Sequence, residues 1–170
     1  MPGAEPSPTS TEISTAIARL EAESDIRHLV ARYAELCDQA YEPDGLAALF
    51  TEDATWSSRS KDGTVDFGQY RGREQIRRFF AGASADLGPT TLHYLLTPRI
   101  EVAPDLLSAT GHWYLYAILD QRPAGSEPGS PERERVVLGG SYSHDYRKLD
   151  GSWLISRLAC DIVLESPFPS

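Results

Sequence analysis

The order of hydrophobic patterns along this chain is the feature that most constrains its fold. Apolar residues between positions 13 and 41 recur mostly three or four residues apart, which predicts an amphipathic helix, with an interruption near residues 23–25 left open. Pro43 disfavours helical backbone at the residue before it, so the helix is expected to end between Gln39 and Tyr41. Shorter helices are predicted over residues 44–50 and 73–83. Between them we expect a short strand over residues 54–57 and a polar loop over residues 58–72, suited to covering a pocket.

The second half of the chain predicts long strands, over residues 91–102, 107–121, 133–148 and 152–164. Residues 123–131 contain Gly, Ser and Pro and are expected to form a long exposed hairpin connection. Because helices come first and strands afterwards, the fold class is α+β rather than alternating βαβ units. We expect a long curved antiparallel sheet with the helices on one face and a cavity between the two layers.

Size and charge exclude several classes of protein. The chain has 170 residues, which suits a disordered tail over residues 1–10 and a single domain over residues 11–166. Its 16 basic and 25 acidic residues give a formal charge of −9, which would repel a phosphate backbone, so nucleic-acid binding is not expected.

The chain also lacks signals for membranes, secretion and metals. No segment resembles a signal peptide, and no apolar run approaches the ~18 residues that cross a bilayer. Cys37 and Cys160 match no metal-ligand spacing, and the four histidines match none either. We therefore expect a cytoplasmic protein with two buried thiols, no membrane contact, no metal and no phosphate-binding glycine loop.

One histidine lies in a strand with apolar residues on both faces. On the strand over residues 91–102, His93, Leu95 and Thr97 share one face, and both faces carry apolar residues, which places this strand inside the sheet. A buried imidazole beside a carboxylate is a common base, although a core histidine with one hydrogen bond fits the same pattern.

The faces of the next two strands cannot be assigned from alternation alone. If His93 faces the cavity, the second long strand offers either His112, Tyr114, Tyr116 and Ile118 or Gly111, Trp113, Leu115 and Ala117. The third offers either Gly140, Tyr142, His144, Tyr146 and Lys148 or Ser141, Ser143, Asp145 and Arg147. The first set in each case is rich in aromatic rings with polar tips, which suit a pocket for a ringed, partly polar molecule.

Several strings, in this order, resemble the SnoaL-like family of the nuclear-transport-factor-2-like superfamily. They are IRHLVARYA (26–34), LAALFTEDA (46–54), YRGREQI (70–76), LHY (92–94) and GGSY (139–142) followed by DGSW (150–153). With the elements between them, the resemblance covers residues 13–164. It implies a cone-shaped α+β barrel whose curved sheet wraps around about three N-terminal helices, with an internal cavity.

Within that family, the chain resembles scytalone dehydratase, bile-acid 7α-dehydratase and hexachlorocyclohexane dehydrochlorinase, which are cofactor-free lyases with a His–Asp pair. The resemblance assigns the histidine to His93, the aspartate to Asp38 and a catalytic tyrosine to Tyr33. Lys148 takes a position that is often Arg in these relatives. The position of a second pocket histidine holds Ile118, and that of an acidic residue holds Tyr116. The acid that protonates a leaving group is therefore unassigned.

Helical geometry and the resemblance disagree about Asp38. At ~100° per residue, Asp38 lies well off the face that bears Ile26, Tyr33 and Cys37, which predicts a surface or capping residue. It can reach His93 only if the helix loosens there and its last turn borders the pocket. The resemblance reverses the geometric prediction.

Together these observations predict a cofactor-independent lyase that carries out a dehydratase-like β-elimination on a cyclic or aromatic small molecule, in secondary or xenobiotic metabolism. His93 would remove a proton from carbon, Asp38 would orient the imidazole, and Tyr33 would help stabilise the developing oxyanion. The expected substrate-binding residues are Trp56, His112, Tyr114, Tyr116, Tyr142, Tyr146 and Lys148. An isomerase or cyclase for a polyketide- or steroid-like ring and a non-catalytic binding or structural subunit are the alternatives. The resemblance also implies a homodimer or homotrimer.

Overall fold

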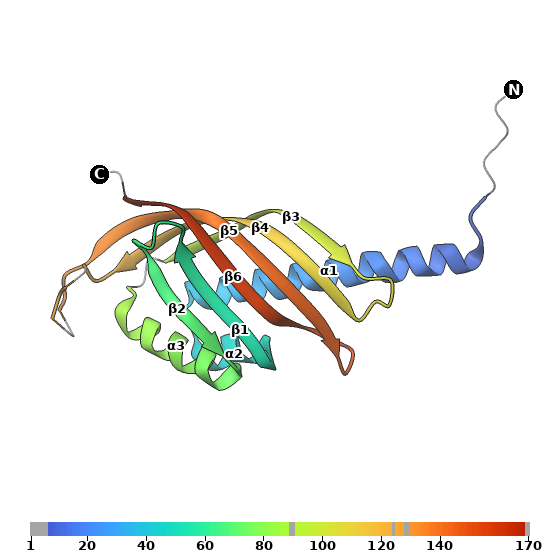
Figure 1. Cartoon of the computed structure of the whole chain (residues 1–170), viewed down its shortest axis with the longest axis horizontal. Helices are drawn as coiled ribbons and strands as arrows, with labels where there is room; N and C mark the ends of the chain where they lie inside the picture. Colours follow the sequence, from blue (N-terminus) through green and yellow to red (C-terminus); the bar gives the residue numbers. More distant parts are fainter. Residues whose placement is uncertain (1–6, 89–90, 124, 128–129, 169–170) are drawn as a thin grey trace, which may run out of the picture.

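The computed structural model describes residues 7–88, 91–123, 125–127 and 130–168, and Figure 1 shows its elements in chain order. Three helices and six strands are assigned among these residues. The helices are α1 (Ser10–Asp38), α2 (Pro43–Ala48) and α3 (Arg73–Asp86). The strands are β1 (Phe50–Ser60), β2 (Asp66–Arg71), β3 (Leu92–Val102), β4 (Ser108–Gln121), β5 (Glu134–Leu149) and β6 (Ser152–Pro167).

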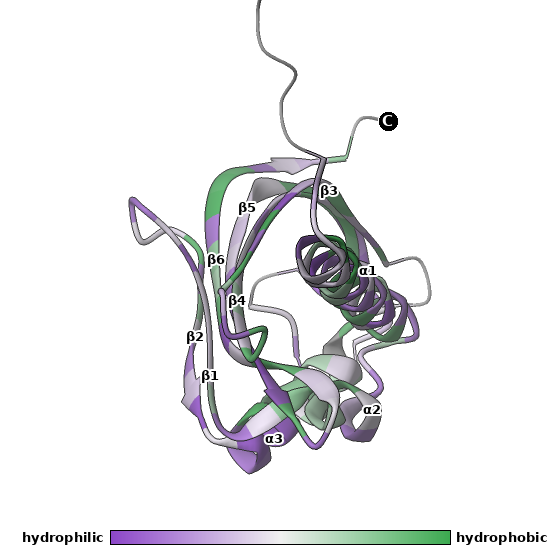
Figure 2. Cartoon of the chain, turned by 90° about the vertical axis from the view of Figure 1, so that its right-hand side faces the viewer, coloured by the Kyte–Doolittle hydropathy of each residue, from purple (hydrophilic) through white to green (hydrophobic). Residues whose placement is uncertain are grey.

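The strands form one curved sheet in the order β2-β1-β6-β5-β4-β3. Strand β1 runs parallel to β6, and every other neighbouring pair is antiparallel. Seen end-on in Figure 2, the sheet bends around α1, and α2 and α3 lie across the lower opening of the curve. The predicted α+β class, with helices against the inner face of a curved sheet, is confirmed.

Helix α1 starts three residues before the predicted helix and ends at Asp38, one residue before the range expected for its end. It begins at Ser10, where the Thr9 hydroxyl accepts from the backbone N–H of Glu12 and the Glu12 carboxylate accepts from the backbone N–H of Thr9. It continues unbroken through residues 23–25 to Asp38. Residues 1–6 of the expected tail lie outside the described residues. The last two residues of the expected tail, Thr9 and Ser10, are the N-cap and the first residue of α1.

The region between the first two helices and α3 differs most from the sequence prediction. Helix α2 ends at Ala48 because Phe50 is already the first residue of β1, which runs to Ser60 instead of spanning only residues 54–57. The predicted loop over residues 58–72 is wrong in part, since it contains β2, an edge strand paired with β1. Polar side chains at this edge gave no apolar alternation from which a strand could be predicted.

The junction into α3 is held by backbone contacts. Gly72 adopts φ 84°, and its N–H donates to the Ala54 carbonyl at 2.7 Å. The following residue, Arg73, donates from its guanidinium to the Phe50 carbonyl and pairs with Glu52. These contacts fix the start of α3 against β1, so the helix lies across the mouth of the curved sheet. Among the described residues, no helix is both long and apolar enough to cross a membrane.

Candidate active site

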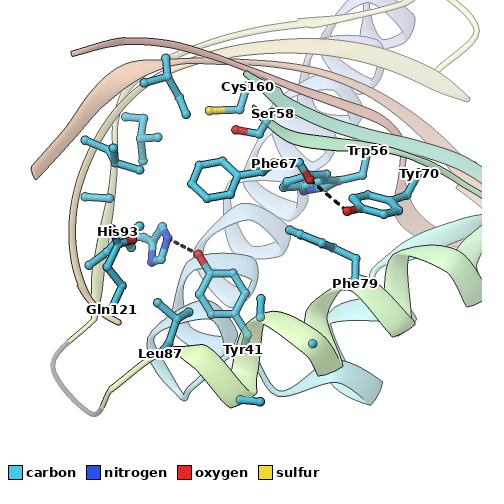
Figure 3. A pocket seen from close by; sticks show the side chains of 18 of the residues that line it. Tyr41, Trp56, Ser58, Phe67, Tyr70, Phe79, Leu87, His93, Gln121 and Cys160 are labelled. Atoms are coloured by element: carbon cyan, nitrogen blue, oxygen red, sulfur yellow. Dashed lines mark hydrogen bonds between the residues drawn. The ribbon is translucent and has the colours of Figure 1, made fainter. Parts of the chain in front are cut away.

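A cavity of about 960 Å³ lies between the inner face of the sheet and the helices. Figure 3 shows side chains from the α1–α2 turn, α3 and the sheet pointing into it, and Tyr33 of α1 lines it as well. This volume is near the upper end of the ~300–1,000 Å³ typical of small-molecule sites. Its walls are mostly rings and aliphatic side chains: Tyr33, Tyr41, Trp56, Phe67, Tyr70, Phe79, Leu87, Leu115, Ala117, Leu119, Leu138, Tyr142 and Ile162.

His93 is the imidazole of this cavity, and both of its ring nitrogens have partners. Its Nδ1 lies 2.9 Å from Asp38 Oδ1, and its Nε2 lies 2.8 Å from the Tyr41 hydroxyl. The side chain of His93 is 4% exposed, and that of Asp38 is 28% exposed. The sequence-derived pairing of His93 with Asp38 is therefore present in the structure.

The chemistry of the two partners fixes the tautomer of His93. A carboxylate oxygen only accepts hydrogen bonds, so the Nδ1 atom that faces Asp38 carries the proton. In the neutral ring, Nε2 then presents a lone pair, and the Tyr41 hydroxyl donates to it. An imidazole held by a carboxylate on Nδ1, with its Nε2 at the wall of a cavity, is the arrangement of a general base.

Asp38 reaches His93 although it lies off the main buried face of α1. The helix does not loosen before it, since Asp38 is its last helical residue and the Gln39 N–H still donates to the Glu35 carbonyl at 3.0 Å. Strand β3 packs along the flank of α1, which brings His93 to the carboxylate. The geometric expectation of a solvent-facing Asp38 is wrong because α1 is covered on more than one side.

Tyr41 is held by an unusual turn between α1 and α2. Ala40 and Tyr41 both adopt left-handed backbone, with φ 57° and 55°, a conformation that costs roughly 1–2 kcal/mol for each non-glycine residue. The Tyr41 ring packs against Phe80, with ring centroids 5.7 Å apart. Burial raises the pKa of the Tyr41 hydroxyl well above its usual value, so it stays a hydrogen-bond donor.

A second group of polar side chains lines the sheet floor of the cavity. Ser58 and Cys160 lie close together there in Figure 3, and Tyr142 belongs to the same wall. Burial raises the pKa of the Cys160 thiol to about 11, so this thiol is protonated and a poor nucleophile at neutral pH. The Tyr33 hydroxyl accepts from Trp56 Nε1 at 3.2 Å on the same side.

The face predicted for β4 is wrong. His93 pairs with Ala117 and Leu95 with Leu115, and directly paired residues share a face, so the aliphatic set lines the cavity. Tyr114 and Tyr116 are 58% and 41% exposed on the outer face. His112 lies on that face too, with its ring edge-to-face against Tyr114. None of these three rings reaches the cavity, because strand parity places them on the opposite side of the sheet.

On β5 the predicted face is right, but two of its residues lie beyond the cavity. Tyr142 lines it, whereas Tyr146 is buried in the core, where its hydroxyl accepts from Trp113 Nε1 at 3.1 Å. Lys148 lies six residues along the strand from Tyr142, about 20 Å away at ~3.3 Å per residue, with Nζ 5.8 Å from the Trp153 ring centroid. Tyr146 and Lys148 are therefore structural neighbours of the core and not parts of the cavity wall.

Sequence reasoning missed Tyr41, the residue in direct contact with the base. The available signal was weak: an aromatic residue three positions after Asp38, in the segment where Pro43 ends the helix. Tyr70 and Phe79, which stack with ring centroids 4.6 Å apart on the cavity wall, were missed as well. Tyr70 lies on the strand that was predicted as a loop. Among the described residues, no group of three or more His, Cys, Asp or Glu side chains is arranged to hold a metal ion.

The sequence profile of the SnoaL-like domain matches residues 18–159, which is most of the chain. The chain belongs to the SnoaL-like family. A search of curated proteins gives no match to this SnoaL-like protein.

Solved structures share the fold of this SnoaL-like protein. A proposed scytalone dehydratase from Novosphingobium aromaticivorans has 21% identity and a TM-score of 0.73, covering 91% of this chain and 93% of its own. The hexachlorocyclohexane dehydrochlorinase LinA-type3 from Novosphingobium barchaimii has 19% identity and a TM-score of 0.71, covering 90% and 94%. A proposed aromatic ring hydroxylase from N. aromaticivorans has 21% identity and a TM-score of 0.71, covering 88% and 94%. At these identities the likeness is one of fold.

Proposed function

We propose that this protein is a cofactor-independent lyase that removes a proton from carbon in a dehydratase-like β-elimination on a cyclic small molecule. The observation that carries the proposal is His93, held by Asp38 at the wall of a large cavity with Nε2 directed to Tyr41. The names of neighbouring structures, which include a proposed dehydratase and dehydrochlorinases, support a lyase or isomerase role of this kind.

Each member of the His–Asp pair has a distinct role in this proposal. His93 Nε2 takes the proton from the carbon next to an activating carbonyl or phenolic group. Asp38 keeps the proton on Nδ1 and stabilises the imidazolium that forms. Hydroxyls on the cavity wall, among them those of Tyr33 and Tyr142, donate to the oxygen on which negative charge develops.

The walls of the cavity indicate the kind of substrate. Trp56, Phe79 and Tyr70 form a stack on one side, with the Trp56 and Phe79 ring centroids 4.3 Å apart. Flat aromatic walls favour a ringed substrate, and a volume of about 960 Å³ holds a molecule of several fused rings. We propose an aromatic or polycyclic substrate with one or more oxygen substituents.

A proton shift without loss of a group is the second candidate. One observation favours it: among the described residues that line the cavity, none is Asp or Glu. A single imidazole can take a proton from one carbon and return it to another, so an isomerase needs no separate acid. Mass spectrometry of the product separates the two, because elimination lowers the mass of the substrate and isomerisation leaves it unchanged.

The proposal is tested with a probe that reports only proton removal from carbon. Nitrobenzisoxazole opens to a coloured nitrophenolate once its ring C–H proton is taken by a base. We expect the wild-type protein to accelerate this reaction and His93→Gln to lose about 100-fold or more of that acceleration.

The matched control is His112→Gln, which changes a histidine on the outer face of the sheet. It should open the probe at the wild-type rate, and circular dichroism should show all three proteins folded. Acceleration that survives His93→Gln would contradict the proposal.

A further inference from the structure

Tyr41 is the hydroxyl placed to act together with His93. Both residues line the cavity, and their rings meet edge to face, with centroids 5.5 Å apart at an interplanar angle of 78° (Figure 3). The hydroxyl lies 2.8 Å from Nε2, the nitrogen that Asp38 leaves unprotonated. In the resting protein, the lone pair needed for proton removal is therefore held by Tyr41.

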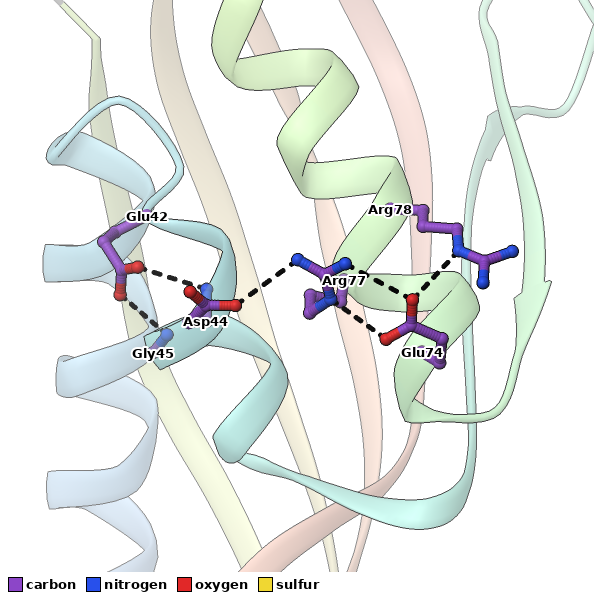
Figure 4. A network of polar contacts seen from close by, with 6 residues as sticks. All are labelled: Glu42, Asp44, Gly45, Glu74, Arg77 and Arg78. Carbon is purple, nitrogen blue, oxygen red and sulfur yellow. Dashed lines mark hydrogen bonds and ion pairs between the residues drawn. The ribbon is translucent and has the colours of Figure 1, made fainter.

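The turn that carries Tyr41 is anchored on its α2 side by a network of ions (Figure 4). The Glu42 carboxylate accepts from the backbone N–H groups of Asp44 and Gly45, at 3.1 and 2.6 Å. Asp44 in turn pairs with Arg77 of α3 at 3.4 Å. The turn itself is held by backbone hydrogen bonds, from the Tyr41 N–H to the Cys37 carbonyl and from the Glu42 N–H to the Leu36 carbonyl, both at 3.1 Å.

A dehydration at this site requires a proton for the departing oxygen, because hydroxide is a poor leaving group. Carboxyl groups are missing from the described residues that line the cavity. Of the other cavity tyrosines, Tyr70 already donates its proton to the Phe67 carbonyl at 3.0 Å, and the proposed function assigns Tyr33 and Tyr142 to the developing oxyanion. Tyr41 is the hydroxyl whose partner is the base itself.

We propose that Tyr41 is the general acid of this site and that it returns to the leaving oxygen the proton that His93 removes from carbon. The inference rests on the proposed function. Substrate binding turns the Tyr41 hydroxyl from Nε2 toward the substrate oxygen, which frees the lone pair.

Protons and electrons balance within the site. The C–H proton passes to His93 Nε2, the C–H electron pair forms the new C=C bond, and the C–O bond breaks. The imidazolium N–H then donates to the Tyr41 oxygen as the proton of Tyr41 passes to the departing oxygen. Water leaves, and both side chains return to their starting protonation states, so no outside acid is consumed.

Two probes separate the acid from the base. Loss of water from the aldol adduct of benzaldehyde and acetone needs a proton on the leaving oxygen, whereas the nitrophenolate released from nitrobenzisoxazole leaves without one. Tyr41→Phe should lower kcat/KM for the aldol adduct about 100-fold and should change the nitrobenzisoxazole reaction far less, because that leaving group needs no proton. His93→Gln should lose both reactions. The control Tyr114→Phe, on the outer face, should change neither.

Each other result overturns the inference. Equal losses on both probes would make Tyr41 a residue that positions His93, and an unchanged aldol reaction would remove it from the chemistry. If the wild-type protein turns over neither probe, the proposed function itself fails.

The resting contact is tested separately by ¹⁵N NMR of protein labelled in histidine. In Tyr41→Phe, the Nε2 signal of His93 should move toward the position of an imidazole nitrogen without a hydrogen bond, and in Tyr114→Phe it should stay. A signal that Tyr41→Phe leaves in place would show that the contact is absent in solution and overturn the inference even if the base is active.

Discussion

Two buried histidines of this protein each meet a tyrosine hydroxyl, yet their surroundings differ. His93 has Asp38 on one nitrogen and Tyr41 on the other, and it borders the cavity. His144 has its Nδ1 2.7 Å from the Tyr146 hydroxyl, and among the described residues its Nε2 has no partner. Burial lowers the pKa of His144 to about 3, so its ring is neutral.

The comparison shows that an imidazole and a phenol are not enough for a catalytic site. In the described part of the chain, His144 hydrogen-bonds to Tyr146, whose hydroxyl also accepts from Trp113, and its Nε2 faces no partner that could stabilise a charged ring. Around His93, the Asp38 carboxylate compensates the positive charge of an imidazolium, and the cavity allows a substrate to reach the ring. The His144 cluster therefore holds the core together, whereas the His93 cluster is arranged for proton transfer.

The largest expected effect comes from making His93 more like His144. Asp38→Asn keeps the size of the side chain but removes the charge and allows the wrong tautomer of the ring. We expect kcat/KM for the nitrobenzisoxazole reaction to fall roughly 10²–10⁴-fold, with little change in thermal unfolding. Activity within threefold of wild type would mean that the carboxylate is not what distinguishes the two histidines.

Next in size is the loss of the hydroxyl at the centre of the core cluster. Tyr146→Phe leaves Trp113 Nε1 and His144 Nδ1 buried without their shared partner. We expect the free energy of unfolding in urea to fall by about 2–6 kcal/mol, because each of the two buried orphans costs ~1–3 kcal/mol. Activity per folded molecule should be unchanged, since Tyr146 does not line the cavity. A loss of activity per folded molecule would show that Tyr146 belongs to the binding site.

The third effect is a dependence of stability on acid. His144 has a folded-state pKa of about 3 against an ordinary value of 6.5. Between these values the unfolded chain binds a proton that the folded chain does not, so stability is full above pH 6.5 and falls as the pH drops toward 3. The His144 contribution should amount to about 2 kcal/mol by pH 5. Urea unfolding at pH 7 and pH 5 measures it, and His144→Phe should remove this part of the slope. A slope that His144→Phe leaves intact would assign the acid sensitivity elsewhere.

The smallest effect is expected on the outer face of the sheet. Tyr116→Phe removes a hydroxyl from a ring that is 41% exposed and packs loosely on Tyr94, with centroids 6.3 Å apart. We expect changes within about 0.5 kcal/mol in unfolding and no change in turnover of either probe. A large loss of activity would contradict the placement of this ring outside the cavity.

Sequence reasoning succeeded where a hydrophobic pattern extended over a long segment, or where a resemblance supplied the residues. The order of helices and strands followed from hydrophobic spacing, and β3 to β6 were predicted to within a few residues. The His93–Asp38 contact came from resemblance, since helical geometry alone predicted a solvent-facing Asp38. Neither hydrophobic spacing nor the resemblance predicted Tyr41, because two consecutive non-glycine residues in left-handed backbone give no sequence signal.

The sequence by itself determined the α+β class, the family and the long strands. Its placement of β3 inside the sheet is wrong, because β3 is an edge strand and helix α1 packs over it at His93. Only the tertiary structure decided which face of β4 lines the cavity, because alternation has a period of two and both faces of that strand carry large side chains. It also decided that β3 covers the flank of α1 and that the following turn places Tyr41 on the free nitrogen of His93. Contacts between segments more than fifty residues apart depend on how whole elements pack, and no local pattern encodes them.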